Sequence, residues 1–441
     1  MIRVVPLDGP LSGDDDSVMP NPLRLCIVAF NAYPAVNPAS GGQVGGTETR
    51  AWLLARQLAK LPDLQVSLAV RTTEPIRQEV VDGVRMIGLR DRFYRLREAV
   101  GGFASRQRGF PWIKVHRWSP SLVWQVPLLA TARLFEARPG DPRQPMPFFE
   151  QIDADLFCCF GNQATAATAI ASAHATGRPS ALFLGSDDDL NPTYTAESVV
   201  RNPYGDTGAT CHFSLTQADT VFVQTPEQQQ LLRDRFDREG ILIPNPIDLH
   251  EWDTRSEASL PAELCGGLDQ FVLWMGRAEN IHKRPQVMVE IAKQCPEVPI
   301  LMLLNPRDPA VDAEVRRSAP GNVRIVTQVP FPLMPALFRK ASAYINTSSL
   351  EGFPNAFLQA AASRIPIVSL NVGRAFLEQS QAGVIVGENE AAAAEELRRL
   401  MDSPEQQVSR GAAGRKYIER HHTIEAVTAR FAESLLAVRR Q

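Results

Sequence analysis

Short apolar runs that alternate with helical segments constrain the fold of this 441-residue chain more than any other feature of its sequence. In the first half, residues 23–30 and 66–70 have the composition of strands, and a glycine-rich loop and a helix over 47–60 separate them. The second half repeats this order, with strands at 271–275 and 343–346. Strands that alternate with helices form open parallel sheets covered by helices on both faces. The sequence therefore predicts an α/β protein, and its length suggests about two or three domains.

The stretch from Ser348 to Leu370, SSLEGFPNAFLQAAASRIPIVSL, predicts a loop, a helix and a buried strand. Pro354 suits the first helical position, where its missing N–H costs nothing. Unpaired amides and the helix dipole favour anions and polar oxygens at that end of a helix. Glu351 offers two acceptor oxygens for neighbouring hydroxyls, and Gln359 lies further along the same helix. This pattern fits a sugar attached to a phosphate; alternatively, Glu351 only stabilises the helix end and Gln359 is a surface residue.

Two cations follow the first strand of the second half. Gly276 permits a ligand to approach the backbone closely, and Arg277 and Lys283 supply positive charge on the loop that follows. Fixed cations at the carboxyl end of a strand would stabilise the charge of a departing diphosphate without a metal. The alternative is that both are solvated loop charges, and His282 is interpreted as a loop residue rather than a base.

Two loops of the first half contain residues that could bind a phosphate or a metal. Gly45 and Gly46 follow the first strand, where glycines let the backbone approach a phosphate, although loops often contain glycine for other reasons. Asp187, Asp188 and Asp189 follow another strand and could form a metal site. We favour the interpretation that these acids cap a helix, and we expect no metal site.

Taken together, these motifs resemble those of the retaining glycosyltransferases of family 4, which have the GT-B fold. Residues 351–355, Glu-Gly-Phe-Pro-Asn, resemble the donor-sugar motif of that family, and Gly276-Arg277 with Lys283 resemble its diphosphate pair. Residues 45–48 match a Gly-Gly-x-Glu motif, and residues 244–248, Pro-Asn-Pro-Ile-Asp, resemble the connector between its domains. The resemblance covers most of the chain from Leu23 onward.

The chain departs from the family pattern at three points. The second acid of the donor motif is Gln359, which can still bind a ribose but carries no charge. In the family, one strand of the N-terminal domain often ends in Val-His-Gly-x-Asp. This chain matches the motif at Gly185 and Asp187 but has Leu184 in the position of the histidine. One more residue separates Arg277 and Lys283 than the family pattern has.

The resemblance implies two Rossmann-like domains that face each other across a cleft. The N-terminal domain would span 23–245, with an insertion at 90–138, and would bind the acceptor. The C-terminal domain would span 246–424 and bind the nucleotide sugar. Residues 425–441 would form a helix that crosses back, and residues 1–22 a flexible leader.

The same resemblance implies retaining transfer of a hexosyl unit from a UDP- or GDP-sugar to a glycan, a lipid-linked or another hydroxyl acceptor. No cofactor, metal or protein nucleophile is expected. Glu351, Arg277 and Lys283 would act on the reacting groups. The implied substrate-binding residues are Gly45, Gly46, Asp187, Gly276, Gly352, Phe353, Pro354, Asn355 and Gln359. Two alternatives stay open: a catalytically silent GT-B partner subunit, and a nucleotide-sugar epimerase on a similar fold.

The insertion at 90–138 differs in composition from the rest of the chain. It contains ten Lys and Arg residues against three acidic ones, in a chain whose net charge is −3, and eight aromatic residues lie among them. Basic and aromatic side chains together favour contact with an anionic membrane surface, or else a solvated helical insertion with some core aromatics. Nothing else supports nucleic-acid binding. The sequence has no signal-peptide pattern and no CxxC pair, so we expect a cytoplasmic protein with reduced thiols. If the insertion binds lipid, the protein would lie at the cytosolic membrane face.

Overall fold

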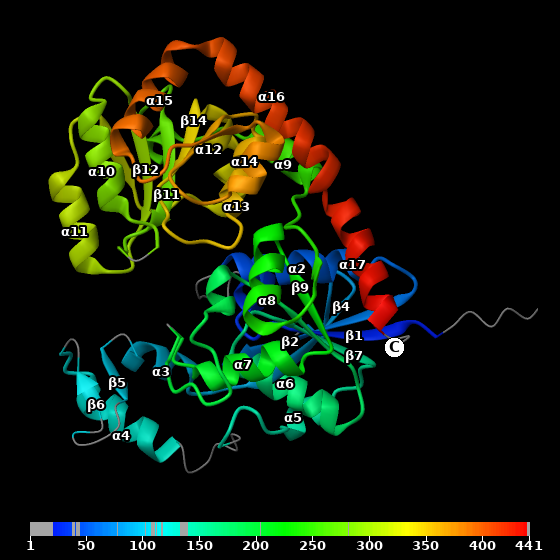
Figure 1. Ribbon diagram of the computed structural model, residues 1–441. Coiled ribbons are helices and arrows are strands. Elements are labelled where there is room, and N and C mark those ends of the chain that lie inside the picture. Colours follow the sequence, from blue (N-terminus) through cyan, green and yellow to red (C-terminus); the bar gives the residue numbers. More distant parts are fainter. Residues whose placement is uncertain are drawn as a thin grey trace, which may run out of the picture.

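The computed structural model describes residues 21–37, 40, 45–76, 78–101, 103–106, 111, 113–115, 118–132, 140–202, 204–280 and 282–438. The expected leader, except its last two residues, lies outside this part of the chain. The described residues form two α/β domains, one above the other in Figure 1. The prediction of an α/β protein with two parallel sheets is confirmed.

An eight-stranded sheet forms the N-terminal domain, in the order β10-β9-β8-β7-β1-β2-β4-β3. All neighbouring strands are parallel except β3 and β4. The strands are β1 Leu23–Val28, β2 Leu64–Thr72, β3 Val80–Val81, β4 Val84–Arg90, β7 Leu156–Phe160, β8 Ser180–Phe183, β9 Thr220–Val223 and β10 Gly240–Leu242. The helices are α1 Tyr33–Val36, α2 Gly46–Leu58, α5 Pro147–Glu150, α6 Ala164–Ala175, η2 Asp187–Leu190, α7 Gly208–Gln217 and α8 Pro226–Phe236.

A six-stranded parallel sheet forms the C-terminal domain, in the order β13-β12-β11-β14-β15-β16. Its strands are β11 Val272–Arg277, β12 Ile300–Asn305, β13 Val323–Val326, β14 Ala343–Asn346, β15 Ile367–Ser369 and β16 Gly383–Ile385. Its helices are α9 Leu249–Ser256, η3 Ala262–Cys265, α10 Pro285–Gln294, α11 Pro309–Ser318, η4 Phe331–Leu333, α12 Met334–Lys340, α13 Asn355–Ala362, α14 Arg374–Ser380, α15 Glu390–Asp402 and α16 Pro404–His421.

Each sheet is buried on both faces, because apolar side chains that alternate along a strand pack against helices on opposite sides. The last helix, α17 Ile424–Val438, follows the C-terminal domain but packs on the N-terminal one (Figure 1). Phe431 of α17 is fully buried against the rings of Phe160, Phe183 and Phe222. The chain therefore passes between the domains twice, before α9 and before α17, and Ile247 pairs with Thr423 where the two passages meet.

The insertion extends from the edge of the N-terminal domain (Figure 1). Its described elements are α3 Tyr94–Gly101, β5 Ala104–Arg106, β6 Ile113–Val115 and α4 Leu122–Ala132, with β5 and β6 antiparallel. Six large apolar side chains are exposed on β6, on α4 and in the loop between them: Ile113, Val115, Trp118, Val123, Trp124 and Leu128. Within the described residues, no helix combines the length and the apolar character needed to span a bilayer.

Candidate functional site

The predicted site residues of the second half lie at the carboxyl edge of the C-terminal sheet. Strand β11 pairs with β12 on one side and with β14 on the other, and the connections lead away in opposite directions from this point. Ligands of open parallel sheets bind at such a switch of strand order. Arg277 is the last residue of β11, and the loop that carries Glu351 follows β14. Topology alone therefore places the two motifs next to each other.

Lys283 and Glu351 form a direct ion pair, with Nζ 2.7 Å from Oε1. Both are largely buried, since the exposed fraction is 27% for the lysine side chain and 17% for the glutamate side chain. Asn346 Nδ2 donates to the same carboxylate at 3.1 Å. Burial alone would raise the pKa of Glu351, but the charge of Lys283 and hydrogen bonds from Lys283, Ser348 and Asn346 outweigh it and hold the pKa below its usual value. Glu351 is therefore an acceptor-only carboxylate at neutral pH.

Arg277 is exposed beside this pair, and its side chain forms no hydrogen bond or ion pair with any described residue. A Cβ atom on Gly276 would lie 2.6 Å from the Trp274 ring and 3.1 Å from Lys283 Cβ. Glycine is therefore needed here so that Trp274 and Lys283 can pack over the strand, and not only for approach to a ligand. The strand extends through Gly276 and Arg277, so the expected loop begins two residues later than the sequence indicated.

The turn after Glu351 contacts the N-terminal domain. A Cβ atom on Gly352 would lie 2.7 Å from Gln228 Nε2 and 2.9 Å from Ser186 Cα. A Cβ atom on Gly46 would likewise lie 2.9 Å from Asn355 Nδ2. Loops at the carboxyl ends of both sheets thus meet at the interface between the domains, and Gly46, Gly352 and Asn355 are brought together there. A Cβ atom on Gly45 would meet Glu48 of its own helix instead.

Other donor-motif residues have structural partners. Phe353 stacks on His422 and packs edge-on against Phe376, so its ring belongs to the core. Pro354 is the N-cap of α13, which begins at Asn355; the prediction that Pro354 is the first helical residue is wrong by one position. Gln359 lies on α13, and its buried Oε1 has no hydrogen-bond partner among the described residues.

The three consecutive acids after β8 form the short helix η2. Asp189 and Ser186 form a capping box, and the Asp189 carboxylate also accepts from the Gly185 amide at 2.5 Å. Asp187 Oδ1 accepts from Gln228 Nε2 at 3.0 Å, and burial raises the pKa of Asp187 to about 6. The capping role is what this geometry provides. In the described part of the chain, no group of three or more His, Cys, Asp or Glu side chains is placed to hold a metal ion.

The sequence did not single out several residues that organise this interface. Arg50 of α2, Asn245 of the connector and Gln228 of α8 are buried polar residues, and Asn245 Nδ2 donates to Asn355 Oδ1 at 2.8 Å. Their partners are far away in the chain, so no local pattern marks them. The only available signal was the position of Asn245 between two prolines.

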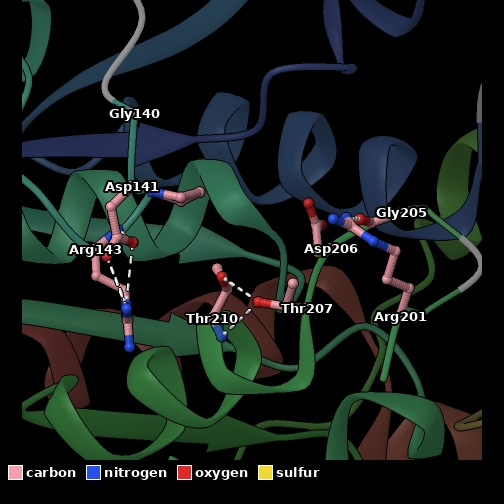
Figure 2. A pocket seen from close by; sticks show the side chains of 9 residues that line it. Gly140, Asp141, Arg143, Arg201, Gly205, Asp206, Thr207 and Thr210 are labelled. Atoms are coloured by element: carbon pink, nitrogen blue, oxygen red, sulfur yellow. Dashed lines mark hydrogen bonds and ion pairs between the residues drawn. The ribbon is translucent and has the colours of Figure 1, made fainter. Parts of the chain in front are cut away.

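A separate polar pocket of about 420 Å³ lies on the N-terminal domain, between residues 140–143 and the loop that leads into α7. Figure 2 shows Arg143 paired with Asp141 on one side of the pocket. On the other side lie Asp206 and Arg201, whose guanidinium donates to the Gly205 carbonyl. Thr207 and Thr210 line its floor, with their hydroxyls 2.9 Å apart. The described lining residues include none of the predicted donor-site residues.

Comparisons with known proteins agree with this architecture. Residues 269–403 match the model of the family described as glycosyl transferases group 1. A search of curated protein sequences found no match. Among solved structures, sucrose-phosphate synthase from Thermosynechococcus elongatus superposes with a TM-score of 0.67 at 18% identity, covering 94% of this chain and 99% of that one.

Two further structures are similar over the whole chain. HepE from Anabaena, solved with UDP and glucose, has a TM-score of 0.62 at 12% identity and covers 94% of this chain and 100% of its own. A trehalose-phosphate synthase (UDP-forming) from Burkholderia vietnamiensis has a TM-score of 0.59 at 12% identity, with coverage of 95% and 99%. These similarities confirm the predicted GT-B fold.

Proposed function

We propose that the chain is a retaining glycosyltransferase that moves a hexosyl unit from a nucleotide-diphosphate sugar to a hydroxyl acceptor. The observation that carries the proposal is the Lys283–Glu351 ion pair at the switch point of the C-terminal sheet. It places a cation and an acceptor-only carboxylate side by side, within the segment that matches the glycosyl transferases group 1 model. A sugar joined to a phosphate would use both groups, the cation for the phosphate and the carboxylate for the sugar hydroxyls.

In this proposal Arg277 and Lys283 bind the diphosphate, and Glu351 accepts hydrogen bonds from sugar hydroxyls. The exposed guanidinium of Arg277 is available for bidentate contact with phosphate oxygens. Backbone amides of Gly352, Phe353 and Asn355 lie where α13 begins and add donors to the same place. Gly46 borders this turn from the N-terminal domain.

The reaction would proceed on one face of the sugar. The bond between the anomeric carbon and the diphosphate oxygen breaks, and the acceptor oxygen bonds to the same carbon from the same side. The acceptor proton passes to the departing phosphate oxygen, so no protein nucleophile is needed. Arg277 and Lys283 stabilise the negative charge that develops on the leaving group, which is the contribution that a metal ion would otherwise make.

Similar structures guide the choice of donor and acceptor. Several were solved with UDP or UDP-glucose, so UDP-glucose is the first donor to test, before GDP-hexoses. The acceptor would bind on the N-terminal domain, which carries both the polar pocket and the insertion. Exposed Trp118 and Trp124 beside basic residues of the insertion favour a membrane-bound or lipid-linked acceptor.

Calorimetric titration with UDP, GDP, UDP-glucose and a GDP-hexose tests the proposal directly. We expect one nucleotide to bind without added metal, and slow hydrolysis of its sugar in the presence of EDTA. A protein that binds none of the four would be the silent partner subunit instead. Activity that EDTA abolishes and manganese restores would return Asp187, Asp188 and Asp189 to consideration as metal ligands.

A further inference from the structure

Arg50 is a buried cation at the interface between the domains. Its exposed fraction is 4%, and the carbon at the centre of its guanidinium lies 4.2 Å from the centroid of the Phe183 ring. Its side chain donates to Leu184 O at 2.7 Å and to Asn245 Oδ1 at 2.8 Å. In the part of the chain that the structure describes, no carboxylate forms an ion pair with it. Burial lowers the pKa of Arg50 to about 10, so it remains charged at neutral pH.

Asp189 and Glu48 act on Arg50 through space but do not contact it. Burying a charge without a carboxylate in direct contact costs stability, so the hydrogen bonds that Arg50 donates must compensate. Both acceptors of Arg50 are neutral, and one of them belongs to the connector between the domains. Asn245 is itself 4% exposed, and its backbone carbonyl accepts from His422 at 2.8 Å. The hydrogen bond to Arg50 therefore joins the N-terminal domain to the point where both interdomain passages meet.

The chemistry of arginine fixes the direction of the hydrogen bonds that follow. Arginine can only donate, so Asn245 must present its oxygen to Arg50 and its amide nitrogen to Asn355. Asn245 Nδ2 does donate to Asn355 Oδ1, at 2.8 Å. Asn355 must then turn its own nitrogen away from the connector, and that nitrogen lies 2.9 Å from where a Cβ of Gly46 would be. No described residue accepts a hydrogen bond from it.

We propose that Arg50 is a positioning residue which, through Asn245, holds Asn355 and the start of α13 against the glycine loop. It thereby sets the arrangement of the two domains in which Glu351 and Lys283 face the N-terminal domain, and it orients the free Asn355 amide toward the donor. Its effect on transfer rests on the proposed function, whereas its effect on domain arrangement does not.

The domain arrangement can be measured without any substrate. All six cysteines are buried, so cysteines introduced at exposed Glu197 in the N-terminal domain and exposed Ala313 in the C-terminal domain can be spin-labelled selectively. We expect Arg50→Met to broaden the label–label distance distribution relative to the parent double-cysteine protein. Arg50→Lys should restore it only in part, because lysine lacks the two-pronged donor geometry.

Arg178→Met is the matched control. Arg178 also donates to backbone carbonyls, of Ile152 and Glu150, and lies over the ring of Phe157, but it does so within the N-terminal domain. Its loss should lower thermal stability while leaving the label distances and the donor KM unchanged. Arg50→Met should raise the KM for donor hydrolysis about fivefold, the factor that one ordinary hydrogen bond supplies.

A second variant keeps the proposal testable if Arg50→Met does not fold. Asn355→Ala keeps the hydrogen bond between Arg50 and Asn245 but removes the acceptor of Asn245 Nδ2, so it should break the second link alone and also broaden the distances. Unchanged distances in both variants would overturn the proposal. If the wild-type protein binds no nucleotide sugar, the proposed function fails, and the distance measurement still decides the role of Arg50.

Discussion

Glu351 is the residue on which the proposed donor site depends most. It keeps its charge despite burial, since Lys283 lies 2.7 Å away. We expect Glu351→Ala to reduce kcat/KM by at least tenfold while the protein stays folded, because each charge-assisted hydrogen bond contributes about 1.5–3 kcal/mol. Glu388→Ala is the control: Glu388 also pairs with a cation, Arg284 at 2.8 Å, but is exposed. Equal kinetics of the two variants would contradict the donor assignment.

The cations of the site should act on phosphate rather than on the nucleoside. We expect Arg277→Ala and Lys283→Ala each to weaken UDP or GDP binding by about 1.5–3 kcal/mol and to leave nucleoside binding nearly unchanged. Lys293→Ala, which removes a lysine from a surface pair with Glu290 in the same domain, should change neither. Calorimetric titrations of the nucleoside and its diphosphate separate the two effects. Unaltered diphosphate affinity in both site variants would place the phosphate site elsewhere.

Asp187 should make stability depend on pH. Burial raises its pKa to about 6 in the folded protein, above the ordinary value of 3.8 for an aspartate. Between these values the folded state holds a proton that the unfolded chain has released, so the free energy of unfolding falls as pH rises. Asp187→Asn keeps an acceptor for Gln228 but cannot ionise. We expect it to be more stable than wild type by about 1–3 kcal/mol at pH 7.5, with little difference at pH 4.

Urea unfolding at the two pH values measures this difference. Asp188→Asn, one residue along η2, is the control for removing a negative charge from the same loop. A stability gain for Asp187→Asn that is the same at both pH values would mean that the carboxyl is not a proton donor or acceptor in this range.

At the scale of elements, the sequence predicted what local patterns encode. The strands that end near Arg277 and before Glu351 were found because buried parallel strands are continuous apolar runs. Boundaries shifted by one or two residues, as at Pro354, because a proline fits both the cap and the first turn. The hydrogen bond between Arg50 and Asn245 spans 195 residues, and no periodicity or motif indicates such a contact.

The insertion is the element whose composition the fold least explains. Trp118 is 68% and Trp124 57% exposed, and Ile113 and Val115 on β6 and Val123 and Leu128 on α4 are exposed as well. Lys114 and Arg92 are exposed on β6 and just before α3. We expect the protein to co-sediment with anionic liposomes, because each basic residue near such a surface contributes about 1 kcal/mol and tryptophan favours the interface.

The dependence of liposome binding on salt and on substitutions tests this expectation. It should weaken as salt rises, require anionic lipid, and fall when Trp118 and Trp124 are both replaced by Ser. Replacing Val199 and Val200, an exposed apolar pair outside the insertion, is the matched control and should have no effect. Recovery in the supernatant under all conditions would favour a soluble acceptor.

For the whole molecule, the connector and α17 tie the two domains together. The connector is short and stiff, with Asn245 between two prolines, and α17 returns to the sheet at which the chain began. Contacts between elements of the two domains, such as the hydrogen bond from Ala375 N of α14 to Glu227 Oε1 of α8 at 3.2 Å, then fix how the domains face each other. The position of Glu351 relative to Gly46 is thus a property of the whole chain rather than of either domain.

We therefore expect α17, the last helix, to contribute to the stability of the N-terminal domain. Phe431 of α17 is fully buried, with its ring centroid 5.0 Å from that of Phe222 and 5.4 Å from that of Phe183. Phe431→Ala leaves a cavity and should cost about 3–5 kcal/mol. Hydrogen–deuterium exchange should quicken in β8 and β9 of the N-terminal domain, whereas Phe338→Ala, a fully buried change in α12, should quicken exchange in β14. If Phe431→Ala instead loosened only the C-terminal domain, α17 would not be part of the N-terminal core.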